Sequence, residues 1–301
     1  MAVLVSTKTN LHQNRTVATV LQVRFLQRLH RFRIDRRALV ARHKVKLNHA
    51  DIMAPLSVGN GEFAFTADVT GLQTFEAEYG TGIPLSTMAQ WGFHAAPNPQ
   101  NFSIETFPLT TIDTSGRPVG YLYYENGKSP KAWEAAANYL YTNPSRFHLG
   151  RVALAMKRSD GHDAALTDLT DIHQELDLWT GCLDSRFTFD GHPVHVSTSC
   201  HPTQNQIAVR IESPLIATGQ VAVRLAFPYG TAAFNGNGAD WSRPNAHQTV
   251  LTRRNTHRAD FARTLDADHY HAALEWAGKA TLSEGEPQRA SAKAKPLSRR
   301  C

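Results

Sequence analysis

The feature that most constrains the fold is the stretch of residues 55–74, PLSVGNGEFAFTADVTGLQT, whose centre alternates between two kinds of side chain. One set of alternate positions is apolar, namely Phe63, Phe65, Ala67 and Val69. A period of two that includes aromatic and β-branched residues is typical of a strand with one buried face. The dipeptide Asn60-Gly61 precedes this strand and predicts a type I′ hairpin turn, because both residues tolerate a positive φ.

The second half of the chain repeats this pattern of strand, turn and strand. Apolar alternation runs up to Asp190-Gly191, a second hairpin turn, and resumes after it. A two-residue turn there pairs Phe187 with Val194, so that the apolar sets of both strands share one face. In this register Cys182 and Cys200 point to opposite faces, and we expect no disulfide between them.

Further strands are expected where apolar residues alternate or cluster between turn signals, at residues 72–75, 103–107, 120–124, 151–156, 167–179, 207–211, 221–227, 249–251 and 269–276. One helix is expected over residues 131–141, with Ser129 as its N-cap and Pro130 at its first position. The fold class that follows is mainly β, a large antiparallel β-sandwich with one or two short helices.

The net charge of +6 comes mainly from the two ends of the chain. No acidic residue precedes Asp35, and the last residues, from Arg289 onward, are basic without an acid. We therefore expect a basic extension over residues 1–33, disordered or weakly helical, a β-sandwich over 34–282 and a disordered basic tail over 283–301. The extension resembles a mitochondrial transit peptide in composition, and a segment that belongs to no fold is the alternative.

Several classes of partner and compartment are not expected from the sequence. The basic ends carry no nucleic-acid-binding motif, so no nucleic-acid partner is predicted. No apolar run approaches the roughly 18–20 residues of a membrane span, and no secretory signal is recognised, which leaves the cytoplasm as the default location.

The sequence contains no catalytic motif that we recognise. It lacks a phosphate-binding glycine loop, a nucleophile elbow and an HExxH pair, and its three cysteines fit neither a disulfide framework nor a zinc site. His269 and His271 could share a metal across one strand face but have no third ligand, so we predict no metal and no cofactor. Carboxylate pairs such as Glu175 with Asp177 could serve glycosidic cleavage, although a solvated acidic face explains them more simply.

The segment QWGFH is the best candidate for ligand binding. A Trp ring can stack on the apolar face of a sugar while nearby polar groups bind its hydroxyls, and the alternative is that the aromatic rings only fill the sandwich. Trp241 suggests the same role in a later loop. Arg42 and His43, which are neighbours in the sequence, are either a structural pair or a further contact with the ligand. The candidate carbohydrate-binding residues are Gln90, Trp91, Phe93, His94, Trp241, Arg42 and His43.

Taken together, several stretches resemble a group of glycoside-hydrolase-like proteins close to the family 65 glycoside hydrolases and disaccharide phosphorylases, in the six-hairpin glycosidase class. The stretches are PLSVGNGEFAFTADVTGLQTF, QWGFH, PNP, YTNPSR followed by LGRVAL, and IHQELDLWTG. The resemblance covers about residues 34–282. It implies a β super-sandwich similar to that of galactose mutarotase, followed by an (α/α)6 barrel that carries the general acid and base. Because a basic tail follows Leu282 in this sequence, we expect the barrel to be missing and carry over no catalytic residue.

Three functions remain open at this point. The first is the truncated, saccharide-facing N-terminal domain of an enzyme that hydrolyses or phosphorolyses glycosidic bonds. The second is a carbohydrate-binding module without catalysis. The third is a mutarotase-like epimerase, which needs a histidine and a carboxylate in a cleft; His195 or His201 with Glu175 are its candidates.

Overall fold

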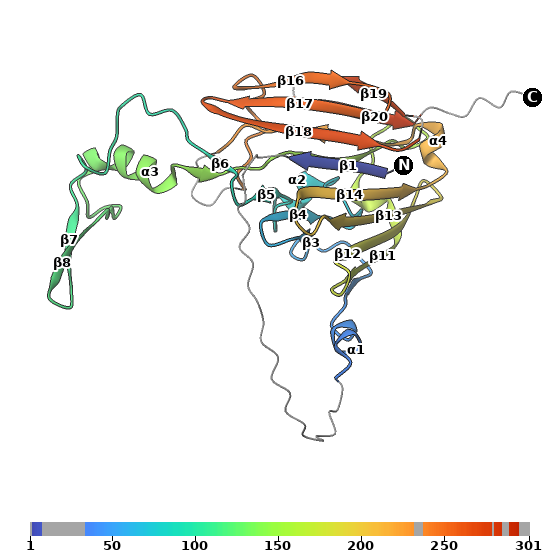
Figure 1. The fold of residues 1–301 in the computed structure, drawn as a ribbon, viewed down its shortest axis with the longest axis horizontal. Coiled ribbons are helices and arrows are strands. Elements are labelled where there is room, and N and C mark those ends of the chain that lie inside the picture. The colour runs from blue at the N-terminus through green and yellow to red at the C-terminus, as the bar shows by residue number, and fades with distance from the viewer. Residues whose placement is uncertain (1, 8–33, 232–236, 279, 285–288, 295–301) are drawn as a thin grey trace, which may run out of the picture.

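The computed structural model describes residues 2–7, 34–231, 237–278, 280–284 and 289–294. The fold is mainly β, as predicted, and its strands pair in antiparallel sheets. In the described residues the largest sheet has nine strands in the order β16-β17-β18-β1-β14-β13-β12-β11-β2 (Figure 1). Its strands are β16 (His247–Arg254), β17 (Arg258–Leu265), β18 (Asp268–Trp276), β1 (Ala2–Thr7), β14 (Asn205–Glu212), β13 (His192–Cys200), β12 (Cys182–Phe189), β11 (Leu169–Asp177) and β2 (Val45–Leu47).

Smaller sheets cover the inner face of this large sheet. One has the order β10-β15-β20-β19, and a second has the order β3-β4-β5. Their strands are β10 (Arg151–Met156), β15 (Val221–Ala226), β20 (Arg289–Ala294), β19 (Ala280–Glu284), β3 (Leu56–Gly59), β4 (Phe63–Ala67) and β5 (Thr87–Ala89). Four short helices accompany the described strands: α1 (Arg36–Ala41), α2 (Glu76–Tyr79), α3 (Glu134–Thr142) and α4 (Leu215–Thr218). No helix in the described part of the chain is long and apolar enough to cross a membrane.

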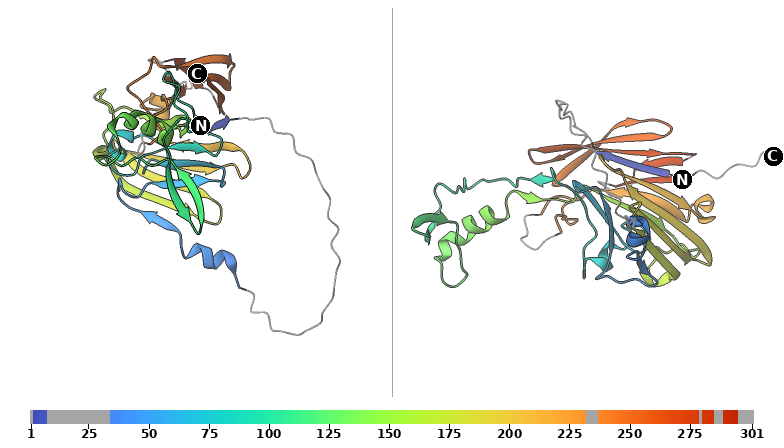
Figure 2. Two further views of the ribbon diagram at one scale, coloured as in Figure 1. Left: turned by 90° about the vertical axis from the view of Figure 1, so that its left-hand side faces the viewer. Right: turned by 60° about the horizontal axis from the view of Figure 1, so that its bottom comes forward.

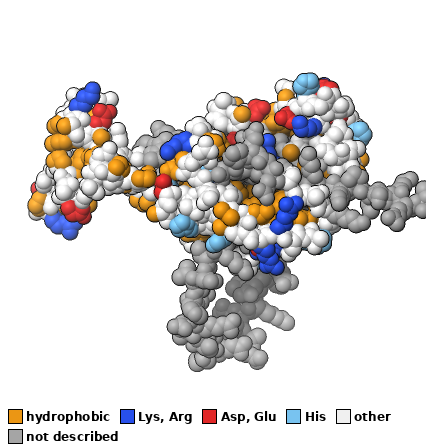
Figure 3. Space-filling view, turned by 90° about the horizontal axis from the view of Figure 1, so that it is seen from above, with side chains coloured by type: hydrophobic (Ala, Val, Ile, Leu, Met, Phe, Trp, Pro, Cys, Tyr) orange, Lys and Arg blue, Asp and Glu red, His pale blue; other side chains and the backbone are white. Residues whose placement is uncertain are grey.

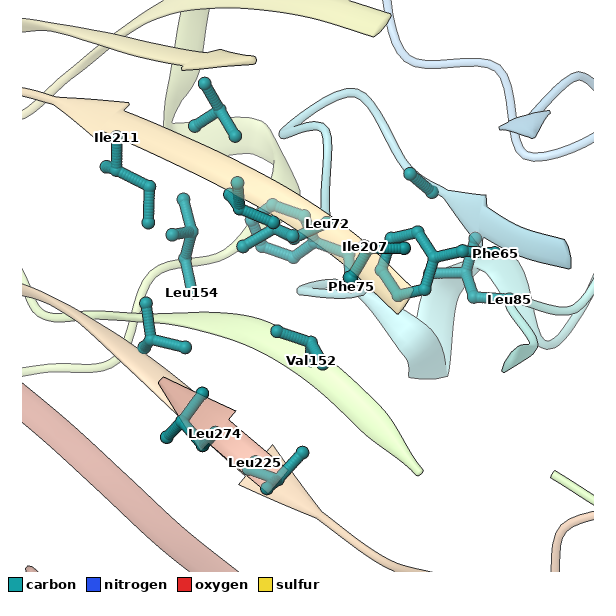
Figure 4. Packing of buried hydrophobic residues seen from close by; sticks show 14 of the residues in the cluster. Phe65, Leu72, Phe75, Leu85, Val152, Leu154, Ile207, Ile211, Leu225 and Leu274 are labelled. Carbon is teal, nitrogen blue, oxygen red and sulfur yellow. The ribbon is translucent and has the colours of Figure 1, made fainter. Parts of the chain in front are cut away.

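The hydrophobic core lies between the sheets. Side chains from β14 lie opposite side chains from β10, with Leu225 of β15 and Leu274 of β18 beyond them and Phe65 and Leu85 at one end (Figure 4). The predicted alternation of β4 is confirmed, because Phe63, Phe65 and Ala67 are all buried. A sheet face that buries alternate apolar side chains against a second sheet is the usual origin of a sandwich.

The hairpin of β12 and β13 forms in the predicted register. Phe187 pairs with Val194 and both are buried, while Asp190 and Gly191 take φ values of 48° and 74° in the turn. Two consecutive positive φ values are the requirement of a type I′ turn. Cys182 pairs with Ser199 rather than with Cys200, and both of these cysteines are free.

The turn between β3 and β4 differs from the type I′ turn that Asn60-Gly61 predicted. Gly61 has a φ of 91°, but Asn60 does not take a positive φ and instead stands before the turn. The Asn60 side chain accepts hydrogen bonds from the backbone N–H groups of Glu62 and Phe63 and donates to the carbonyls of His201 and Gln204. One positive φ at the first central position is the pattern of a type II′ turn.

Residues 72–75 do not form the predicted strand, because a buried polar network holds them in a turn. The Asp68 carboxylate accepts hydrogen bonds from the backbone of Thr70, Thr74 and Phe75 and from the Thr70 hydroxyl. Asp68 has no exposed surface, and burial raises its pKa to about 6 against the opposing effect of these hydrogen bonds. A carboxylate that binds successive backbone N–H groups favours a compact turn over an extended ladder.

An arm leaves the sandwich between β6 (Phe93–His94) and β9 (Ser145–Arg146), which pair with each other (Figures 1 and 2). It holds the hairpin of β7 (Thr110–Thr114) and β8 (Arg117–Tyr121) and the helix α3. Hydrophobic side chains lie on its surface (Figure 3), including Ile104, Leu109, Ile112, Tyr121, Tyr123 and Tyr141.

The arm also corrects three predictions. The strand expected at residues 120–124 lies earlier in the chain, as β8. Residues 103–107 form a turn rather than a strand. The helical segment begins with a 3₁₀ turn at Lys131–Trp133, and Ser129 does not cap it, because its hydroxyl accepts a hydrogen bond from the backbone of Glu125.

The ends of the chain differ from the sequence-based expectation. Strand β1 lies within the segment expected to be disordered or weakly helical, and it pairs with β14 and β18. Its residues, AVLVST, precede the first basic residue and are mostly apolar or β-branched, which favours a strand. Strand β20 lies within the segment expected to be a disordered tail. Residues 283 and 284 of the expected tail belong to β19, and the remaining residues of both expected tails, 1, 8–33, 285–288 and 295–301, lie outside the described residues.

Candidate functional site

In the QWGFH segment some side chains lie on the surface and others point into the interior. Gln90 follows β5 and is exposed, and Phe93 on β6 is 44% exposed. Trp91 is partly buried, with its ring centroid 6.1 Å from that of Tyr270, and His94 is buried. Because neighbouring strand residues point in opposite directions, Phe93 and His94 cannot face the same ligand. The segment therefore contributes to two separate places.

Gln90 borders an open cleft of about 300 Å³, which we call the hairpin cleft. The hairpin of β3 and β4 forms its floor from the small residues Gly59, Gly61 and Ala64. A Cβ atom on Gly59 would lie 2.6 Å from the carbonyl oxygen of Phe63, so only glycine fits there without a shift of the backbone. Glu62, Gln90 and Arg146 supply polar groups around this floor.

Arg146 joins the hairpin cleft to the exposed aromatic ring. Its guanidinium carbon lies 4.8 Å from the Phe93 ring centroid, and its Nη1 donates a hydrogen bond of 3.1 Å to the carbonyl of Ala89. The pairing of β6 with β9 places Phe93 directly opposite Arg146. Arg146 was not among the predicted residues, because the whole length of the arm separates the two strands in the sequence.

His94 belongs to a partly buried polar cluster on the other side of β6. Its Nδ1 lies 2.9 Å from Asp268 Oδ2, and its Nε2 lies 3.3 Å from Asp266 Oδ2. Tyr229 donates its hydroxyl to Asp266 Oδ2 at 2.5 Å, and its ring meets the His94 ring edge-on at 5.3 Å. We call these four residues, His94, Tyr229, Asp266 and Asp268, the His94 cluster.

Local structure explains why the His94 cluster assembles. Asp266 occupies the tight turn between β17 and β18 with a φ of 50°, a conformation that aspartate tolerates better than most residues. Asp268 also accepts a hydrogen bond from the backbone of Ala95, which fixes the first residue of the arm. Gly230 leaves room for the imidazole, since a Cβ atom there would lie 2.6 Å from His94 Cδ2.

The His94 cluster has the chemical groups of an acid–base site. Burial, together with the hydrogen bond to Asp266, raises the pKa of Tyr229 to about 12. The side chains of Asp266 and Asp268 keep part of their surface exposed, while His94 lies behind them. Histidine held between carboxylates is a common arrangement for proton transfer. Tyr229, Asp266 and Asp268 were not predicted, because no local motif marks them and they lie more than a hundred residues from His94.

The remaining candidate residues lie elsewhere. Trp241 packs beneath Arg151, whose guanidinium carbon is 4.4 Å from its ring centroid, and beside His148, at 5.9 Å between ring centroids. Burial lowers the pKa of His148 to about 4. Arg42 and His43 are exposed at the end of α1, which projects from a different part of the sandwich than β6 (Figures 1 and 2).

The pairing suggested for an epimerase does not form. Glu175 binds Lys44 and Lys46, with O–N distances of 2.6 and 3.3 Å. His195 lies instead between Asp184 and Glu212, at 2.6 and 3.2 Å. His201 receives a hydrogen bond from the backbone of Thr203 and contacts no carboxylate in the described residues.

Within the part of the chain that the structure describes, no group of three His, Cys, Asp or Glu side chains is arranged to hold a metal. Comparison of the sequence with models of known protein families and with curated proteins found no match. The function is therefore inferred from the fold and from the geometry of the hairpin cleft and the His94 cluster.

Proposed function

We propose that this chain is a saccharide-binding β-sandwich of the carbohydrate-active class, and that it contacts its ligand at the hairpin cleft. The observation that carries this proposal is the meeting of Gln90, Glu62 and Arg146 around a small-residue floor, beside the exposed ring of Phe93. An apolar platform with a few convergent polar groups is the common form of a small-molecule site.

The polar groups of the cleft match the needs of sugar hydroxyls. A hydroxyl both donates and accepts hydrogen bonds, and the cleft offers a carboxylate acceptor, a guanidinium donor and an amide that does both. The exposed part of the Phe93 ring can pack against the apolar face of a sugar. A volume of about 300 Å³ is at the small end for ligand sites and suits a single sugar ring better than a long chain.

The resemblance to glycoside-hydrolase-like proteins supports a wider proposal, that the sandwich serves an enzyme acting on glycosidic bonds. Hydrolysis with either stereochemical outcome uses two carboxyl groups. Of the described residues that line the hairpin cleft, one carries a carboxyl group, Glu62. We therefore propose binding at this cleft and assign no catalytic residue to it.

A mutarotase-like epimerase is the second candidate, and the His94 cluster favours it. In anomer interconversion a base removes the proton of the anomeric hydroxyl while an acid protonates the ring oxygen. The bond between C1 and the ring oxygen breaks to give the open-chain aldehyde. The reverse steps then close the ring on the other face of C1. Asp266 with Tyr229, backed by His94, could supply the acid and the base.

A glycan array with purified protein tests the binding proposal, followed by titration of the best ligand. Phe93→Ala and Gln90→Ala are expected to weaken binding about tenfold, a size that fits the loss of one stacking or hydrogen-bonding contact. Tyr121→Ala is the matched control, because Tyr121 is an aromatic residue with the same exposed fraction, 44%, on the arm. Absence of saccharide binding, or equal affinity of all three variants and the wild type, refutes the proposal.

Two assays on the same protein separate the candidate functions. Release of reducing sugar from the bound glycan would show hydrolysis. Faster equilibration of α and β anomers, followed by NMR and lost in Asp266→Asn, would favour the epimerase. Binding without either reaction favours a carbohydrate-binding module.

A further inference from the structure

A second cleft lies on the outer face of the nine-stranded sheet, far along the chain from the QWGFH segment. Alternate residues of β2, β11, β12, β13 and β14 point to this face, and the strand register places them in rows. One row holds Lys46, Glu175, Asp184, Ser197 and Arg210. The next row holds His173, Arg186, His195 and Glu212.

Ion pairs hold the carboxylates of these rows in place. Lys44 approaches Glu175 at 2.6 Å, and this hydrogen bond lowers the pKa of Glu175. His195 Nε2 lies 2.6 Å from Asp184 Oδ2, and Arg186 Nη2 lies 3.0 Å from Asp184 Oδ1. Both carboxylates are partly buried and each is paired with a cation, Lys44 for Glu175 and Arg186 for Asp184, so they stay fixed as hydrogen-bond acceptors.

The cleft over these rows has a volume of about 620 Å³, within the range of small-molecule sites. Lys46, Glu175, Asp184 and Arg186 line it, together with His173 and Asn48. The side chains of Lys46 and Arg186 are 69% and 65% exposed, and their charged ends pair with Glu175 at 3.3 Å and with Asp184 at 3.0 Å. We call it the outer-sheet cleft.

The charge of the lining indicates the kind of ligand. Two cations, Lys46 and Arg186, balance two anions, Glu175 and Asp184, so the formal charge of the lining is zero with neutral histidine. A charged ligand would be attracted by one pair and repelled by the other. Hydroxyl groups, by contrast, can accept from the cations and donate to the carboxylates at the same time. Among the described residues, no aromatic ring lines the cleft apart from the imidazole of His173, so stacking has a small part.

We infer that the outer-sheet cleft is a second ligand site, which binds a neutral polyhydroxyl compound such as a monosaccharide or a sugar alcohol. This site is separate from the hairpin cleft and does not depend on the function proposed there, since the two clefts share no lining residue.

Titration by NMR with glucose and sorbitol tests the inference, with gluconate and glucosamine as anionic and cationic counterparts. The neutral probes are expected to bind saturably and equally well at low and high salt. Arg186→Gln is expected to weaken this binding about tenfold through the loss of charge-assisted hydrogen bonds, and Glu175→Gln provides a second variant with the same expected effect. Arg210→Gln is the matched control, because Arg210 lies on the same face, is 70% exposed and does not line the cleft.

Each alternative result overturns the inference. Failure of glucose and sorbitol to bind would show that the cleft is only a solvated charged face. Tighter binding of gluconate or glucosamine would show that a charged ligand fits better. An equal loss in Arg210→Gln would show that the effect is not local to the cleft. Binding that is weakened by Gln90→Ala but not by Arg186→Gln would assign the sugar to the hairpin cleft alone.

Discussion

The buried carboxylate of Asp68 should make the stability of this protein depend on pH in a defined window. Burial raises the pKa of Asp68 from an ordinary 3.8 to about 6 in the folded state. The folded protein therefore holds this proton more tightly than the unfolded chain does. Below about pH 4 both states are protonated, and above about pH 6 both are ionised, so the change falls between these values.

The size of the effect follows from the shift. A difference of about two pKa units corresponds to about 3 kcal/mol at 1.36 kcal/mol per unit. The folded state loses stability as the pH rises, because ionisation of Asp68 puts a charge into a site without exposed surface. The contribution of Asp68 to the free energy of unfolding should therefore fall by about 3 kcal/mol from about pH 4 to about pH 6.

The variant Asp68→Asn isolates this contribution, because it has the same shape and cannot ionise. It loses an acceptor for the backbone of Thr74 and Phe75 and should be less stable than the wild type at every pH. Its deficit should shrink by about 3 kcal/mol as the pH rises through the window. Urea unfolding followed by tryptophan fluorescence at a series of pH values measures the difference.

A reference variant and a refuting result complete the experiment. Asp163→Asn, at an exposed aspartate, accounts for the general effect of removing one acidic side chain. A deficit of Asp68→Asn that stays constant, or grows as the pH rises, would refute the reasoning. It would show that the hydrogen bonds to the carboxylate outweigh the effect of burial.

Three further predictions concern packing and turns, and each is measured by chemical or thermal unfolding. Phe65→Ala removes a ring with no exposed surface and should cost about 3–5 kcal/mol; a cost under about 1 kcal/mol would mean that the core collapses around the gap. Gly71→Ala and Gly61→Ala both place a side chain at a positive φ, but only the first puts a Cβ 2.8 Å from Ser185 Oγ, so it should cost at least about 1 kcal/mol more than the second. Asn60→Ala should cost about 1–3 kcal/mol, because it removes hydrogen bonds that join two hairpins, and an unchanged midpoint would contradict that role.

The sequence predicted strands well where one face carries an unbroken apolar alternation. The register of the β12–β13 hairpin follows from such a pattern and from Asp190-Gly191. Strand β17 was missed, because Arg263 interrupts the alternation on its buried face. In the structure Arg263 is almost fully buried, and it donates hydrogen bonds to the carbonyls of Pro228 and Gln248. A single sequence does not show that a charged residue will find such partners.

The candidate sites were less predictable than the strands. The QWGFH segment indicated two exposed residues, Gln90 and Phe93, but strand alternation sends His94 inward. The partners of His94 come from the turn between β17 and β18, and the partner of Phe93 comes from the far end of the arm. These contacts depend on tertiary packing and leave no local signal. The same is true of the outer-sheet cleft, whose rows depend on the registers of four strand pairs.

The attachment of the arm has a consequence for how this architecture can change. The chain leaves the sandwich at His94 and returns at Ser145, and these two residues are direct neighbours across β6 and β9. Everything between them is an insertion whose ends already meet, so its length can vary at only a small cost in loop-closure entropy. A short turn in place of the arm would leave the connectivity of every sandwich strand unchanged. The arm can therefore diverge, shorten or be exchanged as a unit, while the strands of the sandwich keep their order and pairing.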